Sequence, residues 1–185
     1  MNLCSNDYLG IPTVKIQFKQ LQSSSRLVSG NDESYKKLED ALAKHKSKQN
    51  SLIYPTGYMA NLGVISSIAK KGDLILSDEL NHASIIESCK LSDAQVLIYK
   101  HNNMQDLQKK LKHKAKNKFV ITEGIFSMDG DFSFLKQITE VSEKANAIII
   151  VDDAHGDFVV GKDGKGTPNY FNVTKKIDLY ISSLS

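Results

Sequence analysis

Short apolar runs alternate with amphipathic stretches along the chain from Ser51 onward. The runs are rich in Val, Ile and Leu, and the stretches between them have helical spacing over about ten positions. This pattern predicts strands at 51–54, 73–77, 95–99, 118–124, 147–153 and 178–184. It predicts helices at 57–69, after 84, at 104–113 and at 135–145, the first of them ending before Gly72.

The predicted strands are nearly continuous in apolar residues. That composition is typical of strands in a parallel sheet that helices cover on both faces. Because strands and helices alternate, the sequence predicts an α/β fold with a doubly wound, mostly parallel sheet. Residues 1–50 are predicted to form an amino-terminal segment, and residues 51–185 the sheet domain.

Polar segments follow the predicted strands at the point where each strand ends. They are PTGYMAN (55–61), SDELNHAS (77–84), TEGIFSMDGD (122–131), VDDAHGD (151–157) and SSLS (182–185). In doubly wound sheets, ligands bind beyond the carboxyl ends of the strands. The sequence therefore predicts that these segments share a ligand site.

Two helix starts in these segments carry candidate binding residues. Thr56 and Gly57 precede a helix whose first backbone N–H groups suit a phosphate, although Thr56 also fits a simple N-cap. Neither GxxxxGK nor GxGxxG occurs in the chain. His82 also stands at a helix start, where a capping role and a ligand-binding role are both open. Ser127 is not in a GxSxG motif, so a plain turn serine is the alternative to a functional one.

The most specific local pattern is IIIVDDAHGD, which brings Asp152, Asp153 and His155 to the end of a strand. A carboxylate there can keep a proton on a heteroaromatic nitrogen, and the histidine can donate a hydrogen bond to a neighbouring oxygen. A capping aspartate and a metal site remain alternatives. A metal would need a third ligand, which Glu123 could supply.

Composition adds only weak constraints. The net charge is +3, and the lysines concentrate in KKLEDALAKHKSK and QKKLKHKAKNK, which we interpret as solvated helix faces without nucleic-acid binding. Cys4 and Cys89 have no metal-ligand spacing and are expected to be free thiols. We find no signal peptide and no membrane-spanning run, and we expect a cytoplasmic location.

Seven motifs in order resemble those of the α-oxoamine synthases. They are SNDYLG, SRLVSGN, GYMAN, LNHASII, TEGIFSMDGD, VDDAHG and GKGT. The resemblance implies the large cofactor domain of the aspartate-aminotransferase fold, with pyridoxal 5′-phosphate (PLP) as cofactor. NDYLG, SRLVSGN, HNN at 101–103 and DDAHG are most similar to the family member that joins alanine to a pimeloyl thioester in biotin synthesis. Members that use glycine, a C-acetyltransferase among them, remain possible.

The resemblance implies roles for residues around the cofactor. The amides of Gly57 and Tyr58, together with Ser183, would bind the phosphate. His82 would stack on the pyridine ring. Asp152 would pair with the ring nitrogen, raise its pKa and so improve the electron sink for a carbanion.

The remaining roles concern the ring hydroxyl and the substrate. Ser127 and His155 would hydrogen-bond near the ring hydroxyl, and Asn6 and Glu123 would lie near the substrate. His82, Asp152 and His155 are thus the expected catalytic residues, and no metal is expected. The implied substrates are an amino acid and an acyl thioester of coenzyme A or acyl carrier protein, with neither nucleic acid nor membrane as a partner. Family members are homodimers.

The sequence departs from the family pattern in three places. The family's Schiff-base lysine would follow SSLS directly, where the sequence ends. The loop IPTVKIQFKQLQSS before Arg26 is shorter than in the family and has serines where glycines are expected. The resemblance covers most of the cofactor domain and none of the small carboxyl-terminal domain. A truncated, inactive product and one half of a split enzyme are therefore alternatives to an active synthase.

Overall fold

The structure is a computed structural model, and it describes residues 5–10 and 24–184. The chain forms two compact units, Met1–Tyr54 and Pro55–Ser185. The expectation of a free thiol at Cys4 lies outside the described residues, and so does the shortened loop at 11–24 except for Ser24.

The first unit contains helix α1 (Glu33–Lys46). Of its lysines, which the sequence predicts on a solvated face, Lys36, Lys37 and Lys44 are exposed, whereas Lys46 is buried. The strand predicted at 51–54 is wrong, because these residues pair with no strand in the part of the chain that the structure describes. The backbone N–H of Ile53 instead donates to the Glu39 carboxylate (3.0 Å), and its carbonyl accepts from Arg26 (3.1 Å). Arg26 and Glu39 also form an ion pair of 2.8 Å. Side chains thus satisfy the peptide groups that a neighbouring strand would otherwise bind.

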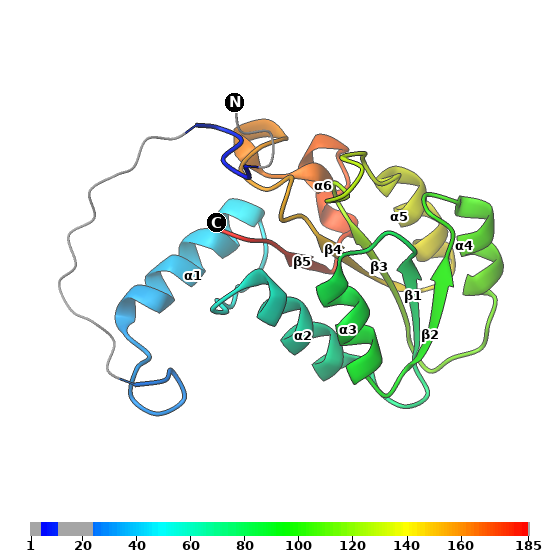
Figure 1. Cartoon of the computed structure of the whole chain (residues 1–185), viewed down its shortest axis with the longest axis horizontal. Coiled ribbons are helices and arrows are strands. Elements are labelled where there is room, and N and C mark those ends of the chain that lie inside the picture. Colours follow the sequence, from blue (N-terminus) through cyan, green and yellow to red (C-terminus); the bar gives the residue numbers. More distant parts are fainter. Residues whose placement is uncertain (1–4, 11–23, 185) are drawn as a thin grey trace. The chain divides into compact units, whose positions relative to one another are not determined.

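The second unit contains a parallel sheet of five strands in the order β2-β1-β3-β4-β5 (Figure 1). The strands are β1 (Leu74–Asp78), β2 (Gln95–Tyr99), β3 (Lys118–Glu123), β4 (Ile148–Asp152) and β5 (Leu179–Ile181). β1, β3 and β4 are buried almost throughout, as their apolar sequences predict. The predicted α/β fold with a doubly wound parallel sheet is confirmed.

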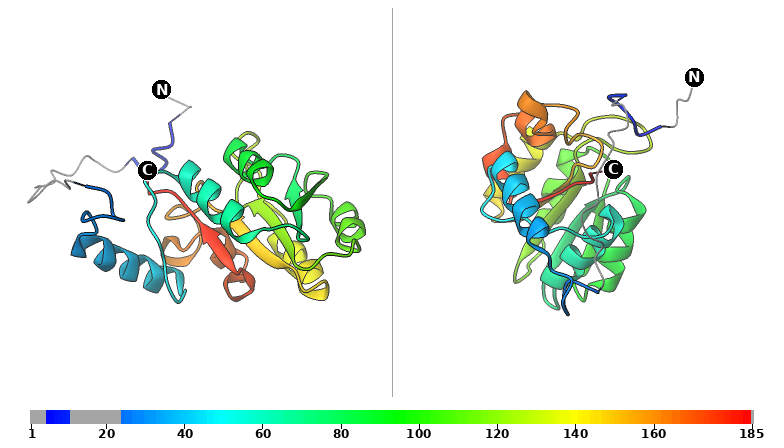
Figure 2. Two further views of the ribbon diagram at one scale, coloured as in Figure 1. Left: turned by 90° about the horizontal axis from the view of Figure 1, so that it is seen from below. Right: turned by 90° about the vertical axis from the view of Figure 1, so that its left-hand side faces the viewer.

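Helices cover both faces of the sheet (Figures 1 and 2). On one face lie α2 (Gly57–Ile68) and α3 (Ala83–Leu91), and on the other α4 (Met104–Leu111) and α5 (Leu135–Lys144). Short helical turns follow at η1 (Lys162–Gly164), α6 (Thr167–Tyr170) and η2 (Thr174–Lys176). The four predicted helices are present at the predicted positions.

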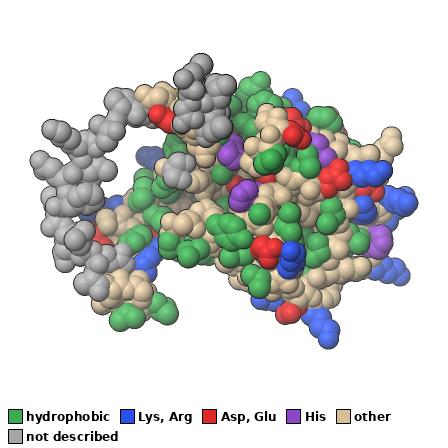
Figure 3. Space-filling view, viewed as in Figure 1, with side chains coloured by type: hydrophobic (Ala, Val, Ile, Leu, Met, Phe, Trp, Pro, Cys, Tyr) green, Lys and Arg blue, Asp and Glu red, His purple; other side chains and the backbone are tan. Residues whose placement is uncertain are grey.

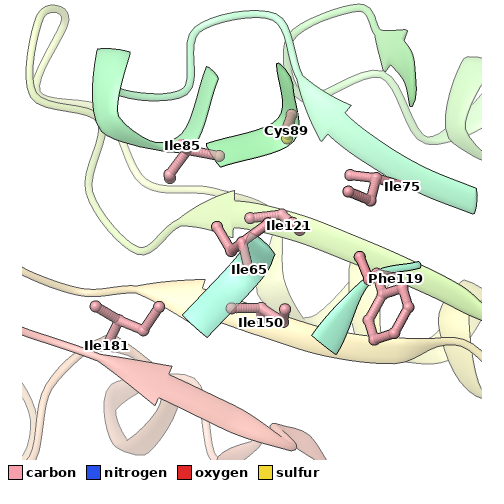
Figure 4. Packing of buried hydrophobic residues seen from close by; sticks show 9 residues of the cluster. Ile65, Ile75, Ile85, Cys89, Phe119, Ile121, Ile150 and Ile181 are labelled. Carbon is pink, nitrogen blue, oxygen red and sulfur yellow. The ribbon is translucent and has the colours of Figure 1, made fainter. Parts of the chain in front are cut away.

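The apolar residues of the helices form a core on each face. Figure 4 shows the core under α2 and α3, where Ile65 and Ile85 pack against strand residues such as Ile75 and Ile121. Cys89 belongs to this core, and burial raises the pKa of its thiol to about 11, so it remains a thiol near neutral pH. On the other face, Leu107 of α4 belongs to a second buried cluster.

The lysine-rich run at the end of α4 lies on the surface. Figure 3 shows Lys and Arg side chains gathered at the side of the second unit where α4 lies. Lys109, Lys112, Lys114 and Lys116 are exposed, in agreement with a solvated face. Among the residues that the structure describes, no helix is long and apolar enough to cross a membrane.

Candidate functional site

The carboxyl ends of the strands bring several predicted residues together. Glu123 ends β3 and Asp152 ends β4, and the strand register places them directly opposite each other. Helix α3 follows β1 and therefore begins at the carboxyl edge of the sheet. Helix α2 precedes β1 and runs back toward the start of that strand, so it begins at the same edge. The site is therefore built on rigid elements.

Asp152 lies at the bottom of this site and is 8% exposed. Its Oδ2 accepts a hydrogen bond of 2.6 Å from the Asn61 side chain, and its Oδ1 accepts one of 3.1 Å from the Ala154 amide. Burial raises the pKa of Asp152, and these hydrogen bonds and the charges of His82 and His155 offset the shift only in part.

Glu123 is the second buried carboxyl group of the site and is 3% exposed. Its Oε2 accepts from the backbone N–H of Ser127 (3.2 Å). Its Oε1 has no hydrogen-bond partner among the described residues. Burial and the charge of Asp152 raise the pKa of Glu123 to about 7. Glu123 thus connects the end of β3 to the segment that carries Ser127.

We expect Glu123→Gln to stabilise the chain at neutral and alkaline pH. A carboxyl group whose pKa rises from 4.5 unfolded to about 7 folded lowers the stability as the pH rises between these values. The amide can keep an accepted hydrogen bond but carries no charge, so the variant should gain about 2–3 kcal/mol above pH ~7 and nothing below pH ~4. Urea unfolding across this pH range measures the difference.

The exposed Glu140 of α5 provides the matched control, because Glu140→Gln removes a charge outside the site. It should leave the pH dependence of the wild-type stability unchanged. If Glu123→Gln and Glu140→Gln gave the same pH profile, the buried charge at Glu123 would not be costly, contrary to this account.

His82 is the N-cap of α3, as one of the two sequence interpretations predicts. Its Nδ1 accepts from the Ser84 amide at 3.2 Å and lies 2.8 Å from the Ser84 hydroxyl. The Tyr58 ring stands edge-on to the imidazole, with 6.3 Å between the ring centres. His82 is exposed, so capping leaves a face of its ring available to a planar ligand.

The start of α2 faces the end of β5. Thr56 caps the helix by accepting from the Met59 amide (3.1 Å), so the amides of Gly57 and Tyr58 remain for an outside acceptor. A Cβ atom added to Gly57 would lie 3.8 Å from the Cβ of Ser183. The two interpretations of this helix start are therefore compatible: Thr56 is an N-cap, and the amides of Gly57 and Tyr58 are open to a phosphate.

Asp153 does not share the site with Asp152. It is completely buried, and its carboxylate accepts from the amide and hydroxyl of Thr167 (2.8 and 2.7 Å) and from the hydroxyl of Tyr180 (2.7 Å). Burial raises its pKa to about 6 although these three hydrogen bonds lower it. A Cβ atom on Gly124 would lie 2.1 Å from the Asp153 carboxylate. Asp153 fixes the chain after β4 and has a structural role.

Asn61 and Ser84 belong to the site although the sequence analysis assigned them no role. The Asn61 amide donates to both Asp152 and the Ser84 hydroxyl (2.9 Å), and both residues are buried. Asn61 is a buried amide in a mostly apolar helix, which is the signal that could have identified it. Together they orient the carboxylate of Asp152.

Two further sequence hypotheses have different outcomes. Asn6 is in the first unit, and its role near a substrate stays a prediction. The alternative of a metal bound by Glu123, Asp152 and His155 is not supported, since no group of three such ligands could hold a metal within residues 5–10 and 24–184.

Comparison with known proteins gives consistent matches along the chain. The model of the aminotransferase class I and II family matches residues 1–185. The 8-amino-7-oxononanoate synthase of Thermoanaerobacter pseudethanolicus is 42% identical over 100% of this chain and 50% of that protein. The enzyme of the same name from Lysinibacillus sphaericus is 42% identical over 98% of this chain and 50% of that protein.

A solved structure is also similar. A serine palmitoyltransferase from S. paucimobilis, described as having bound PLP, has a TM-score of 0.84 and 34% identity. The match covers 87% of this chain and 42% of that one. The chain thus spans about half the length of the curated relatives and of the solved structure that it matches.

Proposed function

Because the chain belongs to the aminotransferase class I and II family, we propose that its site binds PLP and serves a C-acyltransferase. The observation that carries this proposal is the convergence of a buried acid (Asp152), an imidazole (His82) and an open helix start (Gly57) at one sheet edge. These groups suit the ring nitrogen, the ring face and the phosphate of PLP, respectively. The relatives named above support the assignment.

Two features of the site fit this cofactor. Asp152 is a buried carboxyl group whose charge is costly without a cation, and a protonated pyridine nitrogen would supply that cation. At Gly57, a side chain would extend toward Ser183, so the missing Cβ leaves space beside the two open amides of α2. The site therefore has a cation-binding end and an anion-binding end.

In this proposal, the residues of the chain bind and orient the cofactor, and Asp152 controls the proton on its ring nitrogen. Asp152, fixed by Asn61, holds the proton on the ring nitrogen. His82 covers the ring, and Ser127 and His155 would contact its hydroxyl group. When bound, PLP supplies an electron sink for a carbanion at the α-carbon of an amino acid. The amides of Gly57 and Tyr58 with Ser183 anchor the phosphate.

The proposed reaction joins alanine to a pimeloyl thioester of coenzyme A or acyl carrier protein, as in biotin synthesis. It forms the carbon–carbon bond of an amino ketone and releases carbon dioxide and the thiol. The name of the two curated relatives supports this choice. We further propose a homodimer in the cytoplasm as the working form. The similar serine palmitoyltransferase is the reason to test serine, and glycine is the other alternative.

A product assay tests this function. The protein is incubated with PLP, pimeloyl-CoA and one of alanine, glycine or serine, and mass spectrometry identifies the amino ketone. We expect the alanine product to form fastest. A faster reaction with glycine or serine would transfer the assignment to that amino acid. If the protein bound PLP but formed no product, the result would support the two alternatives in which this chain alone is not catalytic, a truncated product or one half of a split enzyme.

We expect Gly57→Ala to weaken the binding of PLP by about tenfold without destabilising the chain. The added methyl group meets Ser183 at an ordinary contact distance, and alanine is a better helix former than glycine by about 1 kcal/mol. The methyl group would, however, occupy space next to the phosphate. Equilibrium dialysis with PLP measures the affinity.

Pyridoxal, which lacks the phosphate, is the matched ligand control for Gly57→Ala. Its affinity should be the same for the variant and the wild type. If both ligands lost affinity equally, the helix start would not be the phosphate site.

A further inference from the structure

A second cluster of polar side chains lies at the same sheet edge, apart from the proposed cofactor contacts. His101 follows β2, and its ring nitrogens each lie 2.9 Å from a carboxylate, Nδ1 from Asp78 and Nε2 from Asp131. Asp78 ends β1, and Asp131 belongs to the segment after β3. The His101 ring also stands edge-on to Phe126, with 4.5 Å between the ring centres. We call His101, Asn102, Asp78 and Asp131 the His101 cluster.

Asn102 makes five hydrogen bonds here, one of them between its side-chain nitrogen and Nε2 of His101 (3.2 Å). Its backbone N–H donates to Asp78 (3.1 Å), and its side-chain amide donates to Asp131 (3.0 Å) and to the carbonyl of Phe132 (3.1 Å). Its Oδ1 accepts from the amide of Phe134 (3.1 Å). Its φ of +50° is one that asparagine tolerates better than most residues. Asn102 thus ties the segment after β3 to the ends of β1 and β2.

The segment held in this way is a tight hairpin, residues 124–133. Ile125 and Phe132 form an antiparallel bridge, and the amide of Ser133 donates to the carbonyl of Gly124 (3.1 Å). Ser127, which the proposed function places near the cofactor ring, lies in this hairpin. Whatever fixes the hairpin therefore also fixes Ser127.

We propose that His101 and Asn102 are positioning residues that hold hairpin 124–133, and with it Ser127, in place, and that His101 makes this dependent on pH. Neither residue needs to touch the cofactor or the substrate. The effect on cofactor binding rests on the proposed function, whereas the control of the hairpin itself does not.

The pH dependence follows from the geometry of the imidazole. Carboxylates only accept hydrogen bonds, so both ring nitrogens must carry a proton to donate to Asp78 and Asp131. Burial lowers the pKa of His101, but the hydrogen bonds and charges of these two acids outweigh it and raise the pKa overall. A third acid, Glu79, accepts from the backbone N–H of His101 (2.8 Å).

Loss of the proton releases the hairpin side of the cluster first. A neutral imidazole has one N–H and keeps one carboxylate contact; an unprotonated Nε2 repels the Asp131 carboxylate and can instead accept from the side-chain amide of Asn102 (3.2 Å). The side chain of Asp78 is completely buried and cannot turn to water, whereas that of Asp131 is 42% exposed. The contact with Asp131 therefore opens as the pH rises through the raised pKa of His101. The stabilisation is complete at lower pH, where the imidazolium persists.

The test follows the hairpin and the cofactor separately across pH. Histidine side-chain NMR gives the pKa of His101, and amide hydrogen exchange reports on the hairpin through Phe126, Gly130 and Ser133, whose amides are hydrogen-bonded within it. Equilibrium dialysis gives the affinity for PLP at each pH. All three are measured on the protein as its source makes it and on variants.

In the wild type, we expect hairpin exchange, corrected for its intrinsic pH dependence, to accelerate and PLP affinity to fall about fivefold as His101 loses its proton. In His101→Gln, neither hairpin exchange nor PLP affinity should change with pH in this way. Comparing the variant with the wild type at each pH separates the effect of His101 from the titration of PLP itself. His113→Gln, at an exposed histidine after α4, should keep both pH dependences. Should His101→Gln fail to fold, Asp131→Asn serves instead, and it should lower the pKa of His101 and flatten both profiles.

The outcomes separate this inference from the proposed function. Wild-type pH steps that persist in His101→Gln or Asp131→Asn would overturn the positioning role. Hairpin exchange that follows His101 in a protein that never binds PLP would support the positioning of the hairpin and contradict the proposed function.

Discussion

Replacing Asp152 with asparagine is expected to weaken PLP binding by about 30-fold or more while making the cofactor-free chain more stable. The loss corresponds to about 2 kcal/mol or more, the usual cost of removing one partner of a buried charge pair. The gain arises because burial raises the pKa of Asp152, so its ionisation costs stability as the pH rises. Asparagine has nearly the same shape and its oxygen can still accept from Asn61, but its amide nitrogen then faces the Ala154 amide, which reduces the gain.

Dialysis against PLP and urea unfolding of the free chain measure the two effects of Asp152→Asn at one pH. Asp163→Asn is the matched control, because Asp163 is exposed and its removal changes the net charge equally. A weaker affinity together with a less stable chain would indicate general damage to the fold. Unchanged affinity would show that Asp152 does not face the cofactor.

Asp153→Ala should destabilise the chain by about 4 kcal/mol or more, the largest loss of stability that we expect from a single substitution. The carboxylate accepts three hydrogen bonds from Thr167 and Tyr180, and its removal leaves three largely buried donors without a partner. Each unsatisfied buried donor costs about 1–3 kcal/mol. The segment after β4 would lose its side-chain contact with Tyr180 of β5.

Urea unfolding monitored by circular dichroism measures this loss, again with Asp163→Asn as the control. Asp153→Asn should lie between Asp153→Ala and the wild type, because it keeps the shape but provides one acceptor oxygen. Wild-type stability in Asp153→Ala would mean that the Asp153 contacts contribute little.

Local patterns were sufficient for most of the fold. The five strands and the helices α2, α3, α4 and α5 of the second unit follow from apolar runs and helical spacing, since burial on both faces leaves a clear pattern. The prediction at 51–54 failed because Arg26 and Glu39 bind the backbone of Ile53 across the first unit. Hydrogen bonds between distant residues leave no mark in a short apolar run.

The two adjacent aspartates show where sequence reasoning about the site stops. Successive side chains of a strand point to opposite faces, so Asp152 and Asp153 cannot serve the same site. The sequence brought both to the end of β4. In the structure, Asp152 accepts a hydrogen bond from Asn61 of α2, and Asp153 accepts one from Thr167 of α6. The pairing of Glu123 with Asp152 likewise depends on the strand register, which the sequence does not contain.

The most direct test of the account is an NMR titration of the ¹⁵N-labelled protein with PLP. We predict saturable amide shifts at the carboxyl edge of the sheet, in Gly57, Tyr58, His82, Ser127 and Ser183, and in Asp152→Asn the same shifts should need about 30-fold more PLP or more. Because the aldehyde of PLP can also react with amines, shifts confined to exposed lysines such as Lys109 and Lys112 would show surface reaction alone. That result would contradict a PLP site in this chain.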